Sequence, residues 1–180
     1  MAATKVLGGD SSGDGSGSGD PRVSYTGGFT GQLVVGMTAS GGGSAVVCES
    51  TRAITGTLTI RLETRADGSV TGFGNTTGSE AEVARTQSSV CTGSFGTVSF
   101  NYGGDITGAA SSMTFRHETR SQGTSPEATT VSTNTLVFQG SLNGNVIAGT
   151  LDFTESGTGE NVGGTFTWHG NTTMAVTLQR

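Results

Sequence analysis

Residues 134–153 read Asn-Thr-Leu-Val-Phe-Gln-Gly-Ser-Leu-Asn-Gly-Asn-Val-Ile-Ala-Gly-Thr-Leu-Asp-Phe, and this stretch predicts a β-hairpin. Two runs that alternate apolar with polar or small residues flank Asn143-Gly144, a pair that supplies the two positive φ angles of a type I′ turn. Such a turn sets a register in which each glycine of the apolar face lies under a large partner. The expected pairs are Leu136 with Leu151, Phe138 with Gly149 and Gly140 with Ile147.

The same alternation recurs along the rest of the chain. Further strand-like runs lie at residues 29–37, 45–48, 54–63, 82–86, 90–91, 98–102, 113–117, 165–169 and 173–179. Asp67-Gly68 predicts a second tight hairpin, which would place Leu62 opposite Phe73. The last two runs are expected to form a hairpin with a three-residue loop, and residues 119–133 are expected to form a long polar loop.

No segment has a helical period, so the fold class is expected to be all-β. Roughly nine or ten strands joined by short turns predict an antiparallel meander that closes into a β-barrel, because closure leaves no bare edge strand. A two-sheet β-sandwich is the alternative.

The Thr-rich meander resembles the avidin and lipocalin barrels in style, a calycin-like plan. The hairpin sequence Leu-Thr-Ile-Arg-Leu-Glu-Thr-Arg-Ala-Asp-Gly-Ser-Val-Thr-Gly at residues 58–72 carries the resemblance. What it implies is a barrel, and it assigns no binding residues. Trp168 is the only tryptophan, whereas several line an avidin pocket, and the Gly-X-Trp opening of the lipocalins is absent.

The composition predicts one domain preceded by an arm. A chain of 180 residues is long enough for one core and short for two. Residues 1–21 are rich in Gly, Ser and Asp and predict a flexible tether, and residues 22–180 are expected to form a single β-domain. The net charge of −5 and the lack of a basic stripe argue against nucleic acid as a partner. No apolar run is long enough for a transmembrane helix, and no signal peptide is present.

The two cysteines, Cys48 and Cys91, both lie in strand-like runs. A disulfide between them is the preferred interpretation, and two buried free thiols are the alternative. A disulfide favours an extracytoplasmic or secreted protein, while a cytoplasmic location stays open because cysteine count alone does not fix the compartment.

No catalytic motif stands out, and the sequence predicts no catalytic residue, metal ligand or cofactor. There is no Gly-x-Ser-x-Gly elbow, no Walker-type loop and no Cys/His cluster. Glu80, Glu82 and Arg85 are interpreted as a solvated charge ladder. His117 shares a face with Phe115, and a hydrogen-bonded core or barrel-mouth histidine is favoured over a catalytic base.

These observations leave two functional hypotheses. The leading one is a non-enzymatic extracytoplasmic β-domain that acts as a surface, adhesion, coat or assembly subunit and self-associates through its N-terminal arm. The alternative is a barrel that binds a small apolar ligand, either as a carrier or as a cofactor-free isomerase or cyclase. Its internal pocket would be lined by Phe115, His117, Phe138 and Trp168.

Overall fold

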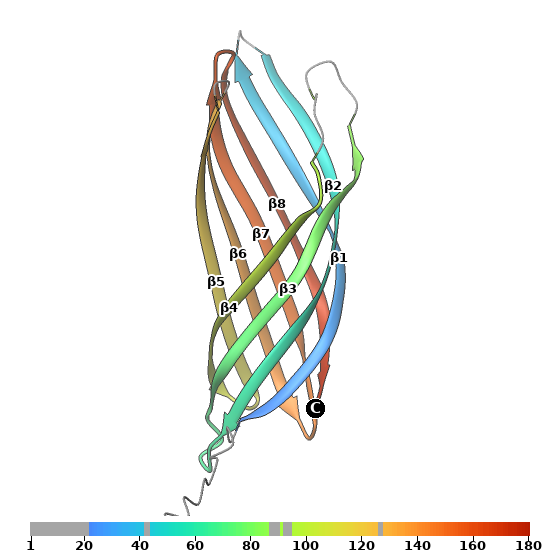
Figure 1. Ribbon diagram of the computed structural model, residues 1–180, viewed down its shortest axis with the longest axis vertical. Helices are drawn as coiled ribbons and strands as arrows, with labels where there is room; N and C mark the ends of the chain where they lie inside the picture. Colours follow the sequence, from blue (N-terminus) through green and yellow to red (C-terminus); the bar gives the residue numbers. More distant parts are fainter. Residues whose placement is uncertain (1–21, 42–43, 87–90, 92–94, 126–127) are drawn as a thin grey trace, which may run out of the picture.

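The computed structural model describes residues 22–41, 44–86, 91, 95–125 and 128–180, which form a closed antiparallel β-barrel of eight strands (Figure 1). The strands are β1 (Val23–Gly41), β2 (Ser44–Thr64), β3 (Val70–Arg85), β4 (Val98–Ala109), β5 (Ser112–Thr124), β6 (Ala128–Asn143), β7 (Val146–Asn161) and β8 (Gly164–Gln179). Each strand pairs with the next, and β1 pairs with β8. The all-β class and the barrel predicted from the sequence are therefore confirmed.

No helix that is long and apolar enough to cross a membrane occurs in the part of the chain that the structure describes. The expected N-terminal arm, residues 1–21, lies outside the described residues.

The two ends of the barrel carry different connections. The turns that join β2 to β3, β4 to β5 and β6 to β7 lie at the lower end in Figure 1, together with the C-terminus, and we call this the turn end. The opposite ends of the strands lie at the upper end, which we call the pocket end.

Alternation along each strand separates an inner from an outer face. On β2, Leu58 and Ile60 are fully buried, whereas Thr57, which precedes Leu58, and Arg61, which follows Ile60, are exposed. All eight strands contribute large apolar side chains to the core, for example Phe29, Ile60, Val70, Ile106, Phe115, Phe138, Ile147 and Leu178. Toward the pocket end the inward positions become polar, since Arg52 precedes Ile54 on β2 and Glu155 follows Phe153 on β7.

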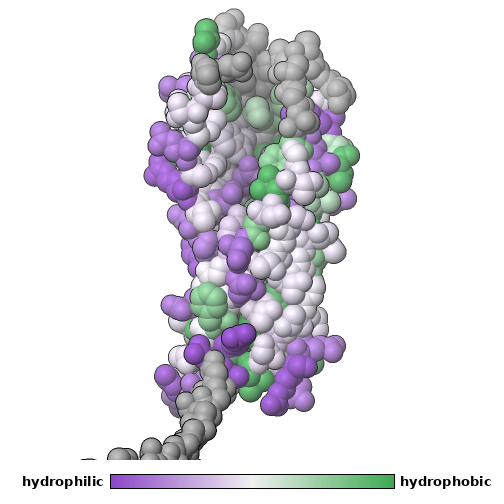
Figure 2. All heavy atoms as spheres, viewed as in Figure 1, coloured by the Kyte–Doolittle hydropathy of each residue, from purple (hydrophilic) through white to green (hydrophobic). Residues whose placement is uncertain are grey.

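The outer face is Thr-rich and has few large apolar side chains. Among the described residues, the large hydrophobic ones that are exposed are Val34, Phe73, Val83, Val98, Val146 and Val162. Figure 2 shows one side of the barrel, on which hydrophobic residues lie in separate groups among hydrophilic and intermediate ones.

The strands are fewer and longer than the sequence pattern predicts. Residues 45–48 and 54–63 lie in the single strand β2, and residues 165–169 and 173–179 lie in β8, so the expected hairpin at the end of the chain is wrong. The expected polar loop at 119–133 is also wrong, because it consists largely of the ends of β5 and β6. Thr and Ser occupy both faces of these strand ends, and such a segment has no apolar alternation to reveal it.

The hairpin at 134–153 exists, but its register differs by two residues from the expected one. Leu136 pairs with Phe153, Phe138 with Leu151, Gly140 with Gly149 and Leu142 with Ile147. Gly144 and Asn145 are the central turn residues, and only Gly144 has a positive φ, of 61°. That is the pattern of a type II′ turn, which needs glycine at the first central position. A shift of two residues keeps every side chain on its expected face.

The hairpin at Asp67-Gly68 differs by one residue, and this difference matters more. Leu62 pairs with Gly72, and Phe73 pairs with Arg61 instead. Because a one-residue shift moves a side chain to the other face, Phe73 lies outside the barrel with 44% of its surface exposed.

β4 and β5 are paired only beside their turn. Their ladder consists of Thr107 with Thr114, Gly108 with Met113 and Ala109 with Ser112. Farther toward the pocket end a side chain bridges the two strands, where His117 Nδ1 donates to the Gly103 carbonyl oxygen at 2.7 Å. The His117 ring also stacks on Tyr102 of β4, with ring centroids 4.9 Å apart. We call this stretch the β4–β5 seam.

Candidate functional site

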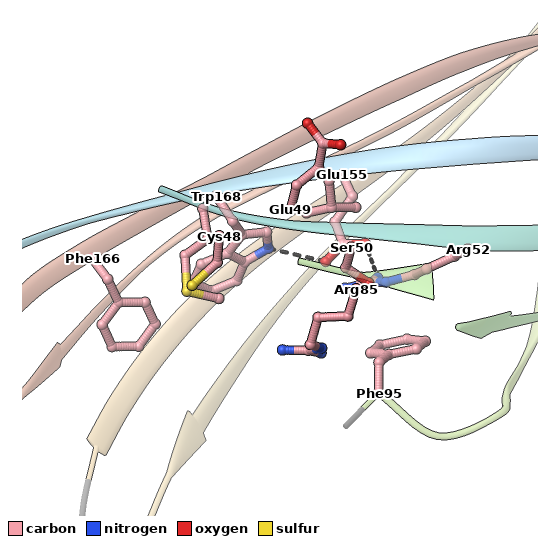
Figure 3. Close-up of a pocket in the computed structure, with 11 residues that line it drawn as sticks. Cys48, Glu49, Ser50, Arg52, Arg85, Phe95, Glu155, Phe166 and Trp168 are labelled. Atoms are coloured by element: carbon pink, nitrogen blue, oxygen red, sulfur yellow. Dashed lines mark hydrogen bonds and ion pairs between the residues drawn. The ribbon is translucent and has the colours of Figure 1, made fainter. Parts of the chain in front are cut away.

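A cavity of about 260 Å³ lies inside the pocket end of the barrel (Figure 3). Its apolar lining consists of Val35, Met37, Cys48, Phe95, Phe166 and Trp168. Its polar lining consists of Glu49, Ser50, Arg52, Arg85 and Glu155. The residues come from β1, β2, β3, β7 and β8 and from the β3–β4 connection, so distant parts of the chain build one site.

A larger hollow, of about 500 Å³, lies on the outer face of β2 and β3 beside Arg61, Phe73 and Asn75. Its side chains point away from the barrel interior, and Arg61 and Phe73 are exposed. This hollow is a surface groove, so the internal cavity is the better candidate for a binding site.

A buried charge cluster forms the inner wall of the cavity. Arg52 Nη1 lies 2.6 Å from Glu155 Oε2 and 3.6 Å from Glu80 Oε2. The three residues are 7% to 9% exposed, and all three point inward because they continue the inner rows of β2, β3 and β7. Ionic groups so far from water are tolerated only when they are paired, and here a single guanidinium holds two carboxylates.

The two carboxylates of this cluster differ in how they are paired. Glu155 accepts hydrogen bonds at both oxygens, one from Arg52 and one from Trp168 Nε1 at 3.0 Å. Burial raises the pKa of Glu80, the nearby Glu155 charge adds to this shift, and Arg52 opposes it. Glu80 is therefore the member of the cluster that takes up a proton more readily than an ordinary glutamate.

A β-bulge in β3 turns a second arginine inward. Thr51 pairs with Ala84 and Arg52 with Glu82, so Val83 has no partner in β2. The extra residue of the bulge reverses which side chains of β3 point inward. As a result, Arg85 rather than Ala84 lies opposite the buried Ser50. Val83 itself is displaced outward and is 58% exposed.

Glu82 fixes the position of Arg85. Its Oε1 accepts from Arg85 Nε at 2.8 Å and from the Ser50 hydroxyl at 2.5 Å, and its Oε2 accepts from the Phe95 backbone N–H at 3.0 Å. These bonds, led by that from Ser50, lower the pKa of Glu82 from 4.5 to about 2. The carboxylate is thus ionised at neutral pH, and it binds the Arg85 guanidinium at Nε.

Aromatic rings adjoin the charge cluster in the wall of the cavity. Trp168 and Phe166 lie next to each other on β8, with ring centroids 5.9 Å apart. Trp168 packs flat on β7 at Gly157, where a Cβ atom would come within 2.1 Å of the indole ring. Only glycine fits at that position with the indole in place. From the β3–β4 connection, the Phe95 ring covers Arg52, whose guanidinium carbon lies 3.5 Å from the ring centroid.

The disulfide between Cys48 and Cys91 anchors the β3–β4 connection to β2, with the two Cα atoms 5.8 Å apart. This pairing confirms the disulfide expected from the sequence. Because Cys48 lines the cavity and Phe95 lies four residues after Cys91, the bridge ties the segment that carries Phe95 to the cavity wall.

The four residues predicted to line a ligand pocket lie in three different places. Phe115 and Phe138 pack against each other in the core, with ring centroids 5.8 Å apart and at most 1% of their surfaces exposed. His117 lies at the β4–β5 seam, and Trp168 lines the cavity. The structure thus does not bring the four together in one cavity, and a contribution of the first three to ligand binding stays a prediction.

Sequence reasoning missed most of the polar lining of the cavity. The sequence pattern predicts a solvated face for Glu80, Glu82 and Arg85, and it does not single out Arg52 or Glu155. A signal for the last two is present, because the inward row of β2 continues from Ile54 to Arg52, and that of β7 continues from Phe153 to Glu155. The inward position of Arg85 depends on the bulge, which alternation cannot reveal.

No group of His, Cys, Asp and Glu side chains suited to hold a metal ion occurs among the residues that the structure describes. Comparisons with protein-family models, with curated proteins and with solved structures found no match for this chain.

Proposed function

We propose that this protein binds a small organic molecule in the cavity at the pocket end. The observation that carries the proposal is the cavity itself, in which charged side chains and aromatic rings meet and are held in place by buried partners. Ligand sites typically combine an apolar lining with a few fixed polar groups. The volume of about 260 Å³ lies at the small end of the range of roughly 300–1,000 Å³ that is usual for ligand pockets. The ligand is therefore of the size of a single substituted ring.

Binding without catalysis fits the carboxylates of the site better than acid–base chemistry does. Glu155 and Glu82 each accept hydrogen bonds at both oxygens from neighbouring protein groups. A general base needs a lone pair within reach of the substrate proton. Both carboxylates orient arginines instead, which is a structural role in a binding site. Glu80 Oε2 has no hydrogen-bond partner, but Glu80 is buried and does not line the cavity.

Trp168 supplies the test, because it is the only tryptophan and it lines the cavity. Titration of the protein with a library of single-ring compounds should give saturable changes in tryptophan fluorescence for a subset of them. Phe166→Ala, which removes part of the cavity wall, should weaken these ligands roughly tenfold, equivalent to about 1.4 kcal/mol. Phe73→Ala removes a phenylalanine from the outer surface and should leave binding unchanged. Equal affinity in the two variants would place binding elsewhere and contradict the proposal.

An extracytoplasmic location is part of the same proposal. What supports it is the disulfide between Cys48 and Cys91, since such bonds persist mainly in oxidising compartments. Thiol titration of protein taken directly from its native host under denaturing, alkylating conditions tests it. Two free thiols would contradict an oxidising location.

A role as a surface or assembly subunit is the second candidate. What supports it is the outer face, where rows such as Thr55, Thr57 and Thr59 on β2 offer hydroxyl groups at a regular spacing. In this proposal the arm at residues 1–21 mediates self-association, and deletion of the arm converts the assembly to monomers. Sedimentation of both forms at micromolar concentration decides, because two monomeric proteins would exclude the arm as the contact.

A further inference from the structure

We infer that the ligand is a small planar organic anion whose carboxylate is bound by Arg85 and whose ring lies against Trp168 and Phe166; this inference rests on the proposed binding function. In Figure 3 the guanidinium of Arg85 extends into the space between the aromatic residues. Among the contacts of the described residues, Arg85 uses Nε for its bond to Glu82. Its two terminal nitrogens remain as the donor pair that faces the cavity, and such a pair matches a carboxylate bidentately.

The other charged groups of the site leave an anion as the best complement. Arg52 is already engaged, by Glu155 at 2.6 Å, by Glu80 at 3.6 Å and by the Phe95 ring over its face. The oxygens of Glu155 and Glu82 accept from protein donors, so neither carboxylate has an oxygen left without a partner for a cationic ligand. Two buried atoms of the charge cluster, Arg52 Nε and Glu80 Oε2, have no hydrogen-bond partner, but Glu80 does not line the cavity and the Phe95 ring covers Arg52. Glu49, the remaining carboxylate of the lining, is exposed to solvent. Of the lining side chains that are not exposed, Arg85 therefore has the donors that a ligand can use.

Glu82 balances the charge of Arg85 but does not compete with the ligand. Its Oε1 bonds Nε and the Ser50 hydroxyl, and its Oε2 bonds the Phe95 backbone N–H. The carboxylate thus occupies one edge of the guanidinium and leaves the other edge for a second carboxylate. Such an arrangement positions an arginine in advance, so that little side-chain entropy is lost when the ligand binds.

The β-bulge at Val83 is a further sign that the position of Arg85 is built into the fold. If the same residues paired regularly, with Val83 opposite Thr51, Ala84 would lie opposite Ser50 and the arginine would point to solvent. The aromatic wall is placed to match, because Trp168 is half-buried and lines the same cavity, next to Phe166. A flat ring that carries a carboxylate can make both contacts at once.

The indole N–H signal of Trp168 tests the inference in ¹⁵N-labelled full-length protein, because one tryptophan gives one such signal. Three probes of equal ring size and different charge are titrated: benzoate, benzamide and benzylammonium. Benzoate should shift the signal saturably with a Kd on the order of 1 mM, which is usual for so small a ligand. Benzamide should bind at least roughly tenfold more weakly, and benzylammonium more weakly still.

Variants then assign the preference to one residue. Arg85→Gln should abolish the difference between benzoate and benzamide, and Arg85→Lys should lose most of it because lysine lacks the planar fork. Arg120→Gln, which changes an exposed arginine on β5, should keep the difference. The amide spectrum of each variant reports whether it is folded. A benzoate preference that survives in folded Arg85→Gln protein would overturn the assignment.

The outcomes separate this inference from the proposed function. If benzamide or benzylammonium binds the cavity as tightly as benzoate, the anion inference is overturned and the binding function stands. If none of the three probes shifts the Trp168 signal at millimolar concentration, both are overturned.

Discussion

Replacement of Arg52 by methionine should destabilise the protein strongly, because Arg52 is the common partner of two buried carboxylates. Methionine keeps much of the volume of the side chain and removes its charge. Glu155 would keep its bond from Trp168 Nε1 but lose the ion pair at 2.6 Å, and Glu80 would lose the arginine at 3.6 Å. Removal of one partner from a buried ion pair typically costs about 3–5 kcal/mol, since the remaining charge stays buried and uncompensated.

The chain offers a matched control for this prediction. Arg116 and Glu118 on β5 are also 2.6 Å apart, but 60% and 52% of their side-chain surfaces are exposed, against 9% and 12% for Arg52 and Glu155. Arg116→Met should therefore cost about 0–1 kcal/mol, as exposed pairs do. The two variants remove the same side-chain atoms from ion pairs of the same length, and the sites differ in burial and in the additional contacts of Arg52 with Glu80 and Phe95.

Urea unfolding followed by circular dichroism measures both variants. With a slope of about 2 kcal/mol/M, the midpoint of Arg52→Met should fall by roughly 1.5–2.5 M. A double variant, Arg52→Met with Glu155→Gln, should recover part of the loss, because the uncompensated charge of Glu155 is then absent. If Arg52→Met and Arg116→Met differ by less than about 1 kcal/mol, the buried cluster does not stabilise the pocket end as argued.

Three further predictions follow from the same structure. Replacing Cys48 and Cys91 by alanine should lower the free energy of unfolding by about 4 kcal/mol in the chain-entropy treatment, since the bridged residues are 43 apart; an unchanged urea midpoint would contradict this. The pKa of Glu82 is lowered from 4.5 to about 2. The ionised carboxylate should therefore stabilise the folded protein fully above pH 4.5, and this stabilisation should be lost as the pH falls toward 2. Thermal melts at a series of pH values test this, because Glu82→Gln should flatten the acid dependence. His117→Ala should speed amide hydrogen exchange in β4 by opening the β4–β5 seam, whereas uniform exchange rates in the variant and the parent protein would show that the histidine does not hold the seam.

The sequence predicts the barrel well where the inner face is apolar. The rows from Ile54 to Leu62 and from Leu136 to Phe153 alternate cleanly, and both lie in strands with the expected faces inward. The prediction fails where both faces are polar, as in residues 119–133, because hydrophobic periodicity is then silent and strand ends resemble loops. Register was also beyond reach at both turns, since one residue more or less in a turn is invisible to alternation but decides where Phe73 points.

The candidate site was hidden for a related reason. Arg52 and Glu155 were detectable in principle, by extending an inward row one step beyond its last apolar member. Arg85 was not, because its inward direction depends on the bulge at Val83, which is a property of pairing between strands rather than of the sequence of β3 alone. Charged residues near the end of a strand are usually solvated, so the sequence alone favours an exposed position for these side chains.

The division of the barrel into an apolar half and a polar half explains how a cavity can persist at one end. At the turn end, side chains such as Ile60, Ile147 and Leu178 are fully buried in the interior, and this burial stabilises the fold. The pocket end lacks this filling, and specific bonds replace it, namely the ion pairs of Arg52, the carboxylate of Glu82 and the disulfide. Hydrogen bonds and ion pairs fix the distance between the strands that line the cavity, whereas apolar side chains tend to relax into an empty space. Stability and binding can thus reside in different halves of one barrel, and substitutions in the cavity wall that spare these bonds should change affinity without unfolding the core.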